Sequence, residues 1–359
     1  MTGHLRRVAA GATLFGATVF GAWTMFGAAT AQQSPPQDKP WHTADGFRNL
    51  DGAPERDIPF STYLEFSWQR LQWSAQAPAI PPGHVLPAAD AVAALAAAGD
   101  ADSITWIGHA TFLIRLVGMT ILTDPFLMPR ASPANFIGPK RFVPPGIPIA
   151  DLPPIDVIVL SHNHYDSLDE RTLAALPNKD TTTVVVPLGL GATFVRLGFE
   201  RVHEIDWFES AEIAAITVTA LPARHWSRRG LADENRTLWM GAAIAGAGKR
   251  IYFSGDSAYA PYFADLGDRF GPFDYGIVGI GAYEPRAMMQ YSHTTPEEAV
   301  DLALDMGAGT LIAMHWGTIQ LGTEPPFEAP ARFRARARAR DLAADRVWVL
   351  AIGETRRLP

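Results

Sequence analysis

Two imidazoles and a carboxylate stand at alternate positions near the middle of the chain, as His162, His164 and Asp166. They follow a short, β-branched apolar run, residues 155–160, which comes after two prolines and is typical of a buried strand. A tight loop at the end of such a strand can turn all three side chains toward one point. Imidazole nitrogens and carboxylate oxygens suit a borderline divalent ion such as zinc. The alternative is a solvated loop that happens to hold two histidines.

Three further polar clusters follow the same pattern, because each comes directly after a predicted strand. They lie at residues 222–226, 254–257 and 315–318 and carry His225, Asp256 and His315. A single histidine of this kind is ordinarily structural, but four strand ends that present His or Asp favour a metal centre assembled from distant segments. The chain has no cysteine, which excludes disulfides, thiolate ligands and a cysteine nucleophile.

The elements that must position these clusters are indicated by apolar patterning and turn residues. Strands are predicted over residues 103–107, 111–117, 120–123, 155–160, 182–186, 213–221, 238–245, 250–253, 310–314 and 347–352. Helices are predicted over residues 87–98, 169–176, 191–197, 296–306 and 331–343. The proline-rich stretch 129–154 is expected at the surface. The strands come in two batches that are partly interleaved with helices, which predicts two sheets sandwiched between helices.

Length, composition and the N-terminal residues limit which classes of protein the chain can belong to. The 359 residues are 48% hydrophobic, enough for one large domain or two smaller ones. The net charge of −7 argues against a nucleic-acid partner. Arg6 and Arg7 precede an uncharged run with a small-x-small cleavage pattern that ends at Ala31. We therefore predict a signal peptide over residues 1–31 and an exported, periplasmic protein. An uncleaved segment that anchors the protein in the inner membrane is the alternative.

Several stretches resemble the metallo-β-lactamase superfamily and, more narrowly, its branch with N-acyl-phosphatidylethanolamine-hydrolysing phospholipase D. These stretches are residues 106–111, 123–125, 130–133, 138–142, 161–169, 279–286 and 315–318. The His-x-His-x-Asp motif identifies only the superfamily, whereas Gly-Ala-Tyr-Glu-Pro-Arg at 281–286 points to the branch. The resemblance implies an αββα sandwich of two mixed β-sheets flanked by helices, with two zinc ions at one edge. A hydrolase domain of this kind is expected over residues 103–359, preceded by a linker and wrapping segment over residues 32–102.

The resemblance also implies a role for each site residue. The implied metal ligands are His162, His164 and His225 for the first zinc, Asp166 and His315 for the second, and Asp256 as the bridge between them. Tyr165 and His293 match positions close to the substrate in this branch. With Asp256, His293 is expected to act in catalysis, by donating to a phosphoryl oxygen or assisting the leaving group.

One position departs from the pattern of the superfamily. Its motif continues His-x-His-x-Asp-His, and Ser167 stands where the last histidine should be. We expect a weaker second zinc site, filled only at high metal concentration or by another ion. His109, in a turn between two predicted strands, either braces the metal loop by hydrogen bonding or binds a ligand. His4, His42, His84 and His203 receive no role.

The sequence therefore predicts a zinc-dependent hydrolase, with a phosphodiester as the substrate. Its substrate class, taken from the resemblance, is an N-acyl-phosphatidylethanolamine-like phospholipid or a small phosphodiester. A lactonase or other ester hydrolase is the alternative enzyme, and a non-catalytic metal-binding relative is the alternative of another class. The arginines between residues 332 and 340 are expected on a solvated helix, and attraction to a membrane surface is a second hypothesis for them.

Overall fold

A computed structural model describes residues 39–51, 58–74, 78–134 and 136–359. These residues belong to one compact unit. The predicted signal peptide, residues 1–31, lies outside the described residues. Among the helices of the described ranges, none has the length and apolarity needed to cross a membrane.

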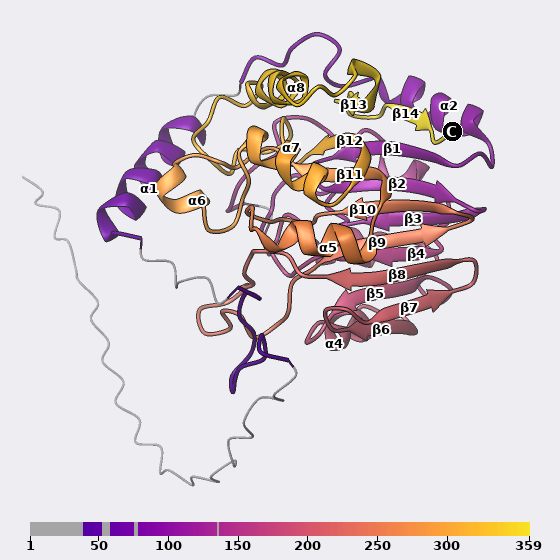
Figure 1. Cartoon of the computed structure of the whole chain (residues 1–359), viewed down its shortest axis with the longest axis horizontal. Helices are drawn as coiled ribbons and strands as arrows, with labels where there is room; N and C mark the ends of the chain where they lie inside the picture. The colour runs from indigo at the N-terminus through magenta and orange to yellow at the C-terminus, as the bar shows by residue number, and fades with distance from the viewer. Residues whose placement is uncertain (1–38, 52–57, 75–77, 135) are drawn as a thin grey trace, which may run out of the picture. The chain divides into compact units, whose positions relative to one another are not determined.

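Two mixed sheets form the centre of the described structure (Figure 1). The first has the strand order β14-β1-β2-β3-β4-β5-β6 and the second β13-β12-β11-β10-β9-β8-β7. The strands are β1 (Ser103–Gly108), β2 (Thr111–Leu116), β3 (Met119–Thr123), β4 (Val157–Val159), β5 (Thr183–Pro187), β6 (Arg201–Ile205), β7 (Ser210–Ile213), β8 (Ile216–Leu221), β9 (Gly241–Gly246), β10 (Lys249–Phe253), β11 (Phe273–Gly279), β12 (Ala308–Met314), β13 (Val347–Trp348) and β14 (Thr355–Arg357). In each sheet an antiparallel group adjoins a parallel group, with the change at β3 in the first sheet and at β10 in the second.

The helices are α1 (Phe60–Ser74), α2 (Ala88–Ala98), α3 (Glu170–Ala175), α4 (Gly191–Arg196), α5 (Tyr262–Phe270), α6 (Arg286–Met289), α7 (Pro296–Asp305) and α8 (Ala329–Ala339). All except α1 and α6 cover the outer faces of the two sheets (Figure 1). Residues of α5, α7 and α8 share a core with the second sheet, while residues of α2, α3 and α4 pack on the first. Figure 1 shows α5, α7 and α8 over the second sheet. The predicted αββα sandwich is confirmed.

Alternation along the strands of the first sheet explains why it is buried on both faces. Val157 and Val159 of β4 point into the core between the two sheets, whereas Ile158 points to the core under α2, α3 and α4. Successive side chains of a strand face opposite sides, so a continuous apolar run is needed where both sides are covered. The burial continues past the end of β4 through Leu160, Ser161 and His162, so the loop that carries the first histidine is itself held in the interior.

The basic run of α8 is bound to its neighbouring helix. Arg332 makes a two-point ion pair with Glu297 of α7, at 2.9 and 2.7 Å. Arg336 binds Asp301 of the same helix at 2.7 Å, and Arg340 approaches that carboxylate to 3.5 Å. Three of the five arginines therefore serve the packing of α8 against α7, which weakens the hypothesis that the run attracts anionic lipid.

Several elements differ from the prediction. The strand expected over 213–221 is β8, which begins only at Ile216 because the chain turns at Ala214, with a φ of 49°; the preceding strand β7 was not predicted. The strand expected over 347–352 is only β13, and the chain then adds β14 to the edge of the other sheet. The elements α1, α5, β6 and β11 were not predicted; β6, for example, is an edge strand with mostly exposed side chains and no apolar alternation. The stretch 129–154 is not simply surface, since Arg141, Val143 and Ile147 are buried.

Segments before β1 lie against the sandwich. Asp206, only 1% exposed, accepts hydrogen bonds from Trp41 Nε1 and Lys39 Nζ, both at 2.8 Å, and lies 2.6 Å from His42 Nε2. Burial alone would raise the pKa of Asp206, but these partners lower it below its ordinary value on balance. Further along, Leu86 pairs with the backbone near the C-terminus.

Candidate metal centre

The predicted ligands meet at the carboxyl ends of strands from both sheets. β4 ends shortly before His162, β8 before His225, β10 before Asp256 and β12 directly before His315. Loops at the ends of buried strands hold their side chains more rigidly than free surface loops do. The structure thus brings together all six predicted ligands at this edge of the sandwich, in two adjoining groups.

The first group contains His162, His164, His225 and Asp256, whose candidate ligand atoms all lie within 4.8 Å of one another. His164 Nδ1 is 2.8 Å from His162 Nε2 and 3.1 Å from His225 Nε2. Asp256 Oδ2 is 3.6 Å from His162 Nε2 and 3.9 Å from His225 Nε2. Atoms bound to one tetrahedral zinc at about 2.0–2.2 Å lie roughly 3.4 Å apart. The spacing of this group therefore fits a single ion.

The second group contains Asp166 and His315 and adjoins the first through Asp256. His315 Nε2 lies 3.7 Å from Asp166 Oδ2 and 3.1 Å from Asp256 Oδ2. The same Asp256 oxygen faces histidines of both groups, as a bridging carboxylate must. His109, for which the sequence left two roles open, also reaches this group: its Nε2 lies 3.0 Å from Asp166 Oδ2.

Hydrogen bonds behind the first group fix the orientation of its rings. His162 Nδ1 lies 2.8 Å from Ser161 Oγ, which in turn donates to Asp124 Oδ2 at 2.5 Å. His225 Nδ1 lies 2.9 Å from the carbonyl oxygen of Ser292. Such partners select the tautomer and leave the other ring nitrogen free for a metal. Burial raises the pKa of Asp124 to about 7, although the hydrogen bonds from Ser161 oppose that rise.

The charges of the site favour a cation. Burial lowers the pKa of His162, His164 and His225, so these rings are neutral, the form in which imidazole binds metals. Burial would raise the pKa of Asp166 and Asp256, but neighbouring histidines hold both pKa values well below the ordinary range. Both carboxylates are therefore ionised and lie close together in the interior, and this negative charge favours the binding of a cation.

Buried atoms without partners also fit a bound metal. Among the described residues, Asp256 Oδ1 and His315 Nε2 are buried side-chain atoms that make no hydrogen bond. Leaving such atoms unpaired is costly, and coordination of an ion removes that cost. The chemistry and spacing of the donors thus fit the metal that the sequence predicts.

Two glycines let the ligand loops approach each other closely. A Cβ at Gly255 would lie 2.6 Å from Ser161 Cβ and 2.8 Å from the carbonyl oxygen of Met240. A Cβ at Gly281 would lie 1.9 Å from the carbonyl oxygen of His315. No side chain fits at these separations, so both positions require glycine to keep the loops of Asp256 and His315 in place.

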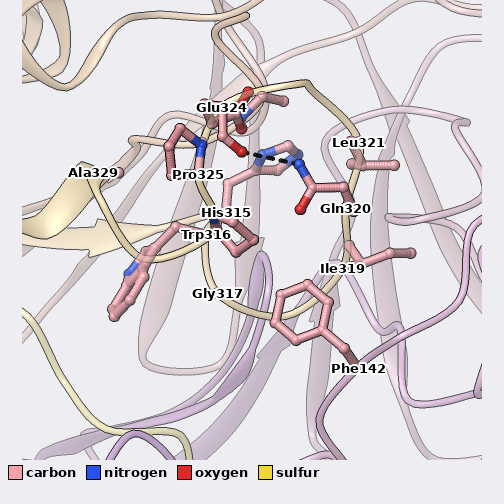
Figure 2. A pocket seen from close by; sticks show the side chains of 13 residues that line it. Phe142, His315, Trp316, Gly317, Ile319, Gln320, Leu321, Glu324, Pro325 and Ala329 are labelled. Atoms are coloured by element: carbon pink, nitrogen blue, oxygen red, sulfur yellow. Dashed lines mark hydrogen bonds between the residues drawn. The ribbon is translucent and has the colours of Figure 1, made fainter. Parts of the chain in front are cut away.

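The branch motif that begins at Gly281 is clamped beside His315 by a buried carboxylate. Glu324 accepts hydrogen bonds from the backbone of Ala282 at 2.7 Å and of Glu284 at 3.2 Å. Burial raises the pKa of Glu324, and the backbone donors partly offset this. Figure 2 shows Glu324 and Gln320 next to His315, where they line a small cavity of about 10 Å³. This loop therefore packs next to His315 and is held there by Glu324.

A much larger cavity, of about 1250 Å³, opens over the two groups. Its polar lining residues include His164, Asp166, His225, Asp256 and His293, and its apolar ones include Ile58, Tyr63, Phe66, Met288, Met289 and Leu321. Arg48, Arg224 and Arg228 also line it. The ligand groups therefore lie at one part of a chamber that is mixed in polarity and large enough for an extended substrate.

The structure places both predicted substrate residues at this cavity. His293 lies beside the ligands, with its ring centroid 5.2 Å from that of His315, and burial lowers its pKa to about 4. Tyr165 also lines the cavity, and its hydroxyl donates to the carbonyl of Arg229 at 3.1 Å. The Tyr165 hydroxyl is thus engaged within the protein.

Sequence reasoning missed two residues that position the site. Arg286 binds both carboxylate oxygens of Glu298 at 2.6 Å and donates to the carbonyl of His293 at 2.8 Å. Its place in the branch motif was the available signal. His84 Nε2 lies 2.6 Å from the carbonyl oxygen of Gly317, next to the His315 loop. Nothing local in the sequence around His84 indicated that contact.

Comparisons with known proteins agree with this geometry. The beta-lactamase superfamily domain matches residues 119–316. An uncharacterized protein of Mycobacterium tuberculosis is 41% identical over 246 residues, which are 67% of this chain and 65% of that protein. The chain thus spans slightly less than two thirds of that relative. The N-acyl-phosphatidylethanolamine-hydrolyzing phospholipase D 1 of Caenorhabditis elegans is 40% identical over 237 residues, 63% of this chain and 67% of its own length.

A solved structure supports the fold. A metallo hydrolase from the archaeon Ignicoccus hospitalis superposes with a TM-score of 0.54 at 20% identity, covering 72% of this chain and 98% of its own. The sandwich, the clustered ligands and the sequence matches lead to one assignment. The chain belongs to the metallo-β-lactamase superfamily and, within it, to the branch that contains N-acyl-phosphatidylethanolamine-hydrolysing phospholipase D.

Proposed function

We propose that this protein is a zinc-dependent phosphodiesterase that hydrolyses N-acyl-phosphatidylethanolamine-like phospholipids. The observation that carries the proposal is the large cavity, which joins a cluster of metal ligands to apolar walls and arginines. The walls suit acyl chains, and the arginines suit a phosphate. The relatives in Caenorhabditis elegans and Saccharomyces cerevisiae that carry the phospholipase D name support the same substrate class.

Zinc is the proposed metal because of the donor set. Three neutral imidazoles and carboxylates, with no thiolate in a chain that lacks cysteine, are characteristic of catalytic zinc sites. When bound, the ion supplies Lewis acidity and activates water for hydrolysis near neutral pH.

Three residues of the chain have separate roles beside the metal. Asp256 connects the two ligand groups, because its Oδ2 lies 3.6 Å from His162 Nε2 in the first group and 3.1 Å from His315 Nε2 in the second. His293, which burial keeps neutral, presents its imidazole to the cavity and can donate a hydrogen bond to a phosphoryl oxygen. Arg286 acts as a positioning residue, because it fixes the backbone of His293 through its hydrogen bond to that carbonyl.

Exposed apolar side chains near the cavity support a substrate drawn from a lipid surface. Tyr63 and Phe66 of α1 line the cavity, while Phe60, Leu64 and Trp68 on the same helix are exposed. Large exposed apolar groups of this kind mark sites that contact membranes or partners. We place the membrane-facing surface on α1 rather than on the arginines of α8, most of which are paired with α7.

The experiment compares three substrates with the purified full chain loaded with zinc. The substrates are an N-acyl-phosphatidylethanolamine in vesicles, a soluble phosphodiester and a lactone, and the His162→Ala variant is the background control. We expect phosphatidic acid and an N-acylethanolamine from the lipid. Faster turnover of the lactone would make the protein an ester hydrolase, and metal-loaded protein that turns over none of the three would make it a non-catalytic relative.

A second comparison tests the surface. Replacing Phe60, Leu64 and Trp68 by serine should lower hydrolysis of the vesicle substrate while turnover of the soluble phosphodiester stays unchanged. Val195→Ser, which alters an exposed apolar side chain on α4, is the matched control and should affect neither substrate. Equal rates on vesicles for the triple variant and the parent would remove α1 from the proposal.

A further inference from the structure

Ser167 leaves the second ligand group without the nitrogen donor that the superfamily motif provides at this position. The serine side chain is fully buried, and its Oγ makes no hydrogen bond. Asp166, His315 and the shared Asp256 would remain as the only donors from the predicted set.

Another histidine lies where a replacement donor is needed. His109 is 1% exposed, and its candidate ligand atom lies within 4.8 Å of those of Asp166 and His315. Its Nε2 is 3.0 Å from Asp166 Oδ2, and its ring centroid is 4.0 Å from that of His315. Around this group the separations between ligand atoms are 3.0, 3.7 and 3.1 Å, which match the 2.8 to 3.9 Å of the first group.

The backbone holds His109 in an unusual conformation that directs it at His315. His109 has a φ of 57° and His315 a φ of 61°, both in the left-handed region that non-glycine residues rarely adopt. The His109 amide donates to Thr318 Oγ1 at 2.9 Å, and its carbonyl accepts from the amide of His315 at 3.1 Å and from Trp106 Nε1 at 2.9 Å. Strain of this kind persists where surrounding contacts enforce it, and it concentrates at functional sites.

We propose that His109 is a ligand of the second metal ion and replaces the histidine that Ser167 has removed. The second site is then formed by His109, Asp166 and His315, with Asp256 shared with the first. Each ion takes two protein donors from loops of the first sheet and two from loops of the second. This assignment reverses the expectation of a weak second site, because the site regains a neutral nitrogen donor.

A bracing role for His109 is the competing explanation, and one substitution separates the two. In a bracing role, His109 Nε2 only donates a hydrogen bond to Asp166. His109→Gln keeps an N–H donor of similar reach but removes the imidazole lone pair. The variant therefore preserves a brace and removes a nitrogen ligand.

The experiment measures the metal content of the full chain after zinc loading and dialysis, without any substrate. We expect two zinc ions per chain in the parent protein and one in His109→Gln and in His109→Ala. His293→Ala is the matched control, because His293 also lies near Asp256 and His315 but faces the cavity; it should retain two ions. In the double variant His109→Ala/Ser167→His, the restored motif histidine should bring the second ion back.

A spectroscopic readout identifies the ligand directly. In the cobalt-substituted protein, each coordinated imidazole gives one paramagnetically shifted, exchangeable N–H proton signal. His109→Gln, which should lose the second ion, should therefore lose two of them, those of His109 and His315. Two tightly held ions in His109→Gln would overturn the proposal, as would a single ion in the parent that His109→Ala leaves unchanged. Far-ultraviolet circular dichroism of each variant verifies that it is folded. Metal content is independent of the substrate, so this result stands apart from the phosphodiesterase proposal.

Discussion

The two halves of the metal centre share Asp256 but are held in place by different means. In the first half, side-chain and backbone partners behind His162 and His225 orient each ring. In the second half, the left-handed backbone of His109 and His315, joined by a hydrogen bond, performs that task. Orientation of a ligand can thus be supplied either by a partner atom behind the ring or by the conformation of the chain that carries it.

Removal of Asp256 should break both halves at once and have the largest effect. Asp256→Asn replaces the charged oxygen that lies between the two groups with a neutral amide. Since Lewis-acid stabilisation by the metal is worth several kcal/mol, hydrolysis should fall by roughly 10³-fold or more. Turnover and metal content of the same sample provide the measurement. Full content of both ions in Asp256→Asn would show that the two halves are independent.

Ser161→Ala should weaken the first half alone. The variant removes the hydroxyl that connects His162 Nδ1 to Asp124. Loss of such a hydrogen bond typically lowers metal affinity by about 10–100-fold. Titration against a chromophoric chelator would resolve the affinity of each ion. A loss confined to the second ion would contradict the division into halves.

Thr318→Val should weaken the second half by a smaller amount. Valine keeps the shape of the side chain but removes the oxygen that accepts the His109 amide. Leaving that buried amide unpaired costs about 1–3 kcal/mol of folding free energy. Because the turn that carries His109 is then held less firmly, the ring should bind the second ion less tightly. The same titration should show a several-fold loss for the second ion, and an unchanged second ion would mean that the turn does not depend on this hydrogen bond.

Asp206→Asn should leave both halves unchanged and alter only stability. The variant weakens the hydrogen bonds from Lys39 and Trp41, and the free energy of unfolding should fall by about 2 kcal/mol at pH 7. Because the folded protein lowers the pKa of Asp206, this stabilisation is complete above the ordinary pKa of aspartate, near 4, and is lost as the pH falls through the folded value. Urea unfolding at pH 7 and in acid should show the difference between variant and parent shrinking in acid. A change in metal affinity would contradict the separation from the site.

The first half could be predicted from sequence because its signals are local. His162 and His164 lie in one motif, and His225 and Asp256 follow strands whose apolar patterns are clear. Burial of both faces of the first sheet produced the continuous apolar run before His162, and that run revealed where the strand ends. The αββα arrangement followed from the same patterns.

The position of His109 could not be predicted in this way. A left-handed backbone leaves no trace in apolar periodicity when the residue is not glycine, and its contacts with Asp166 and Thr318 come from distant parts of the chain. The same reason applies to His84, whose partner is Gly317. The helix α1 was missed because its aromatic residues do not separate a buried face from an exposed one.

The division of ligands between the sheets has a consequence for the lifetime of the protein. With two donors from each sheet on each ion, the metals link the two sheets to each other at the edge where the ligand loops meet. The free energy of metal binding is then also free energy of cohesion between the two layers. Loss of metal would therefore do more than stop hydrolysis, because the two sheets would separate more often at this edge and expose the chain to proteases.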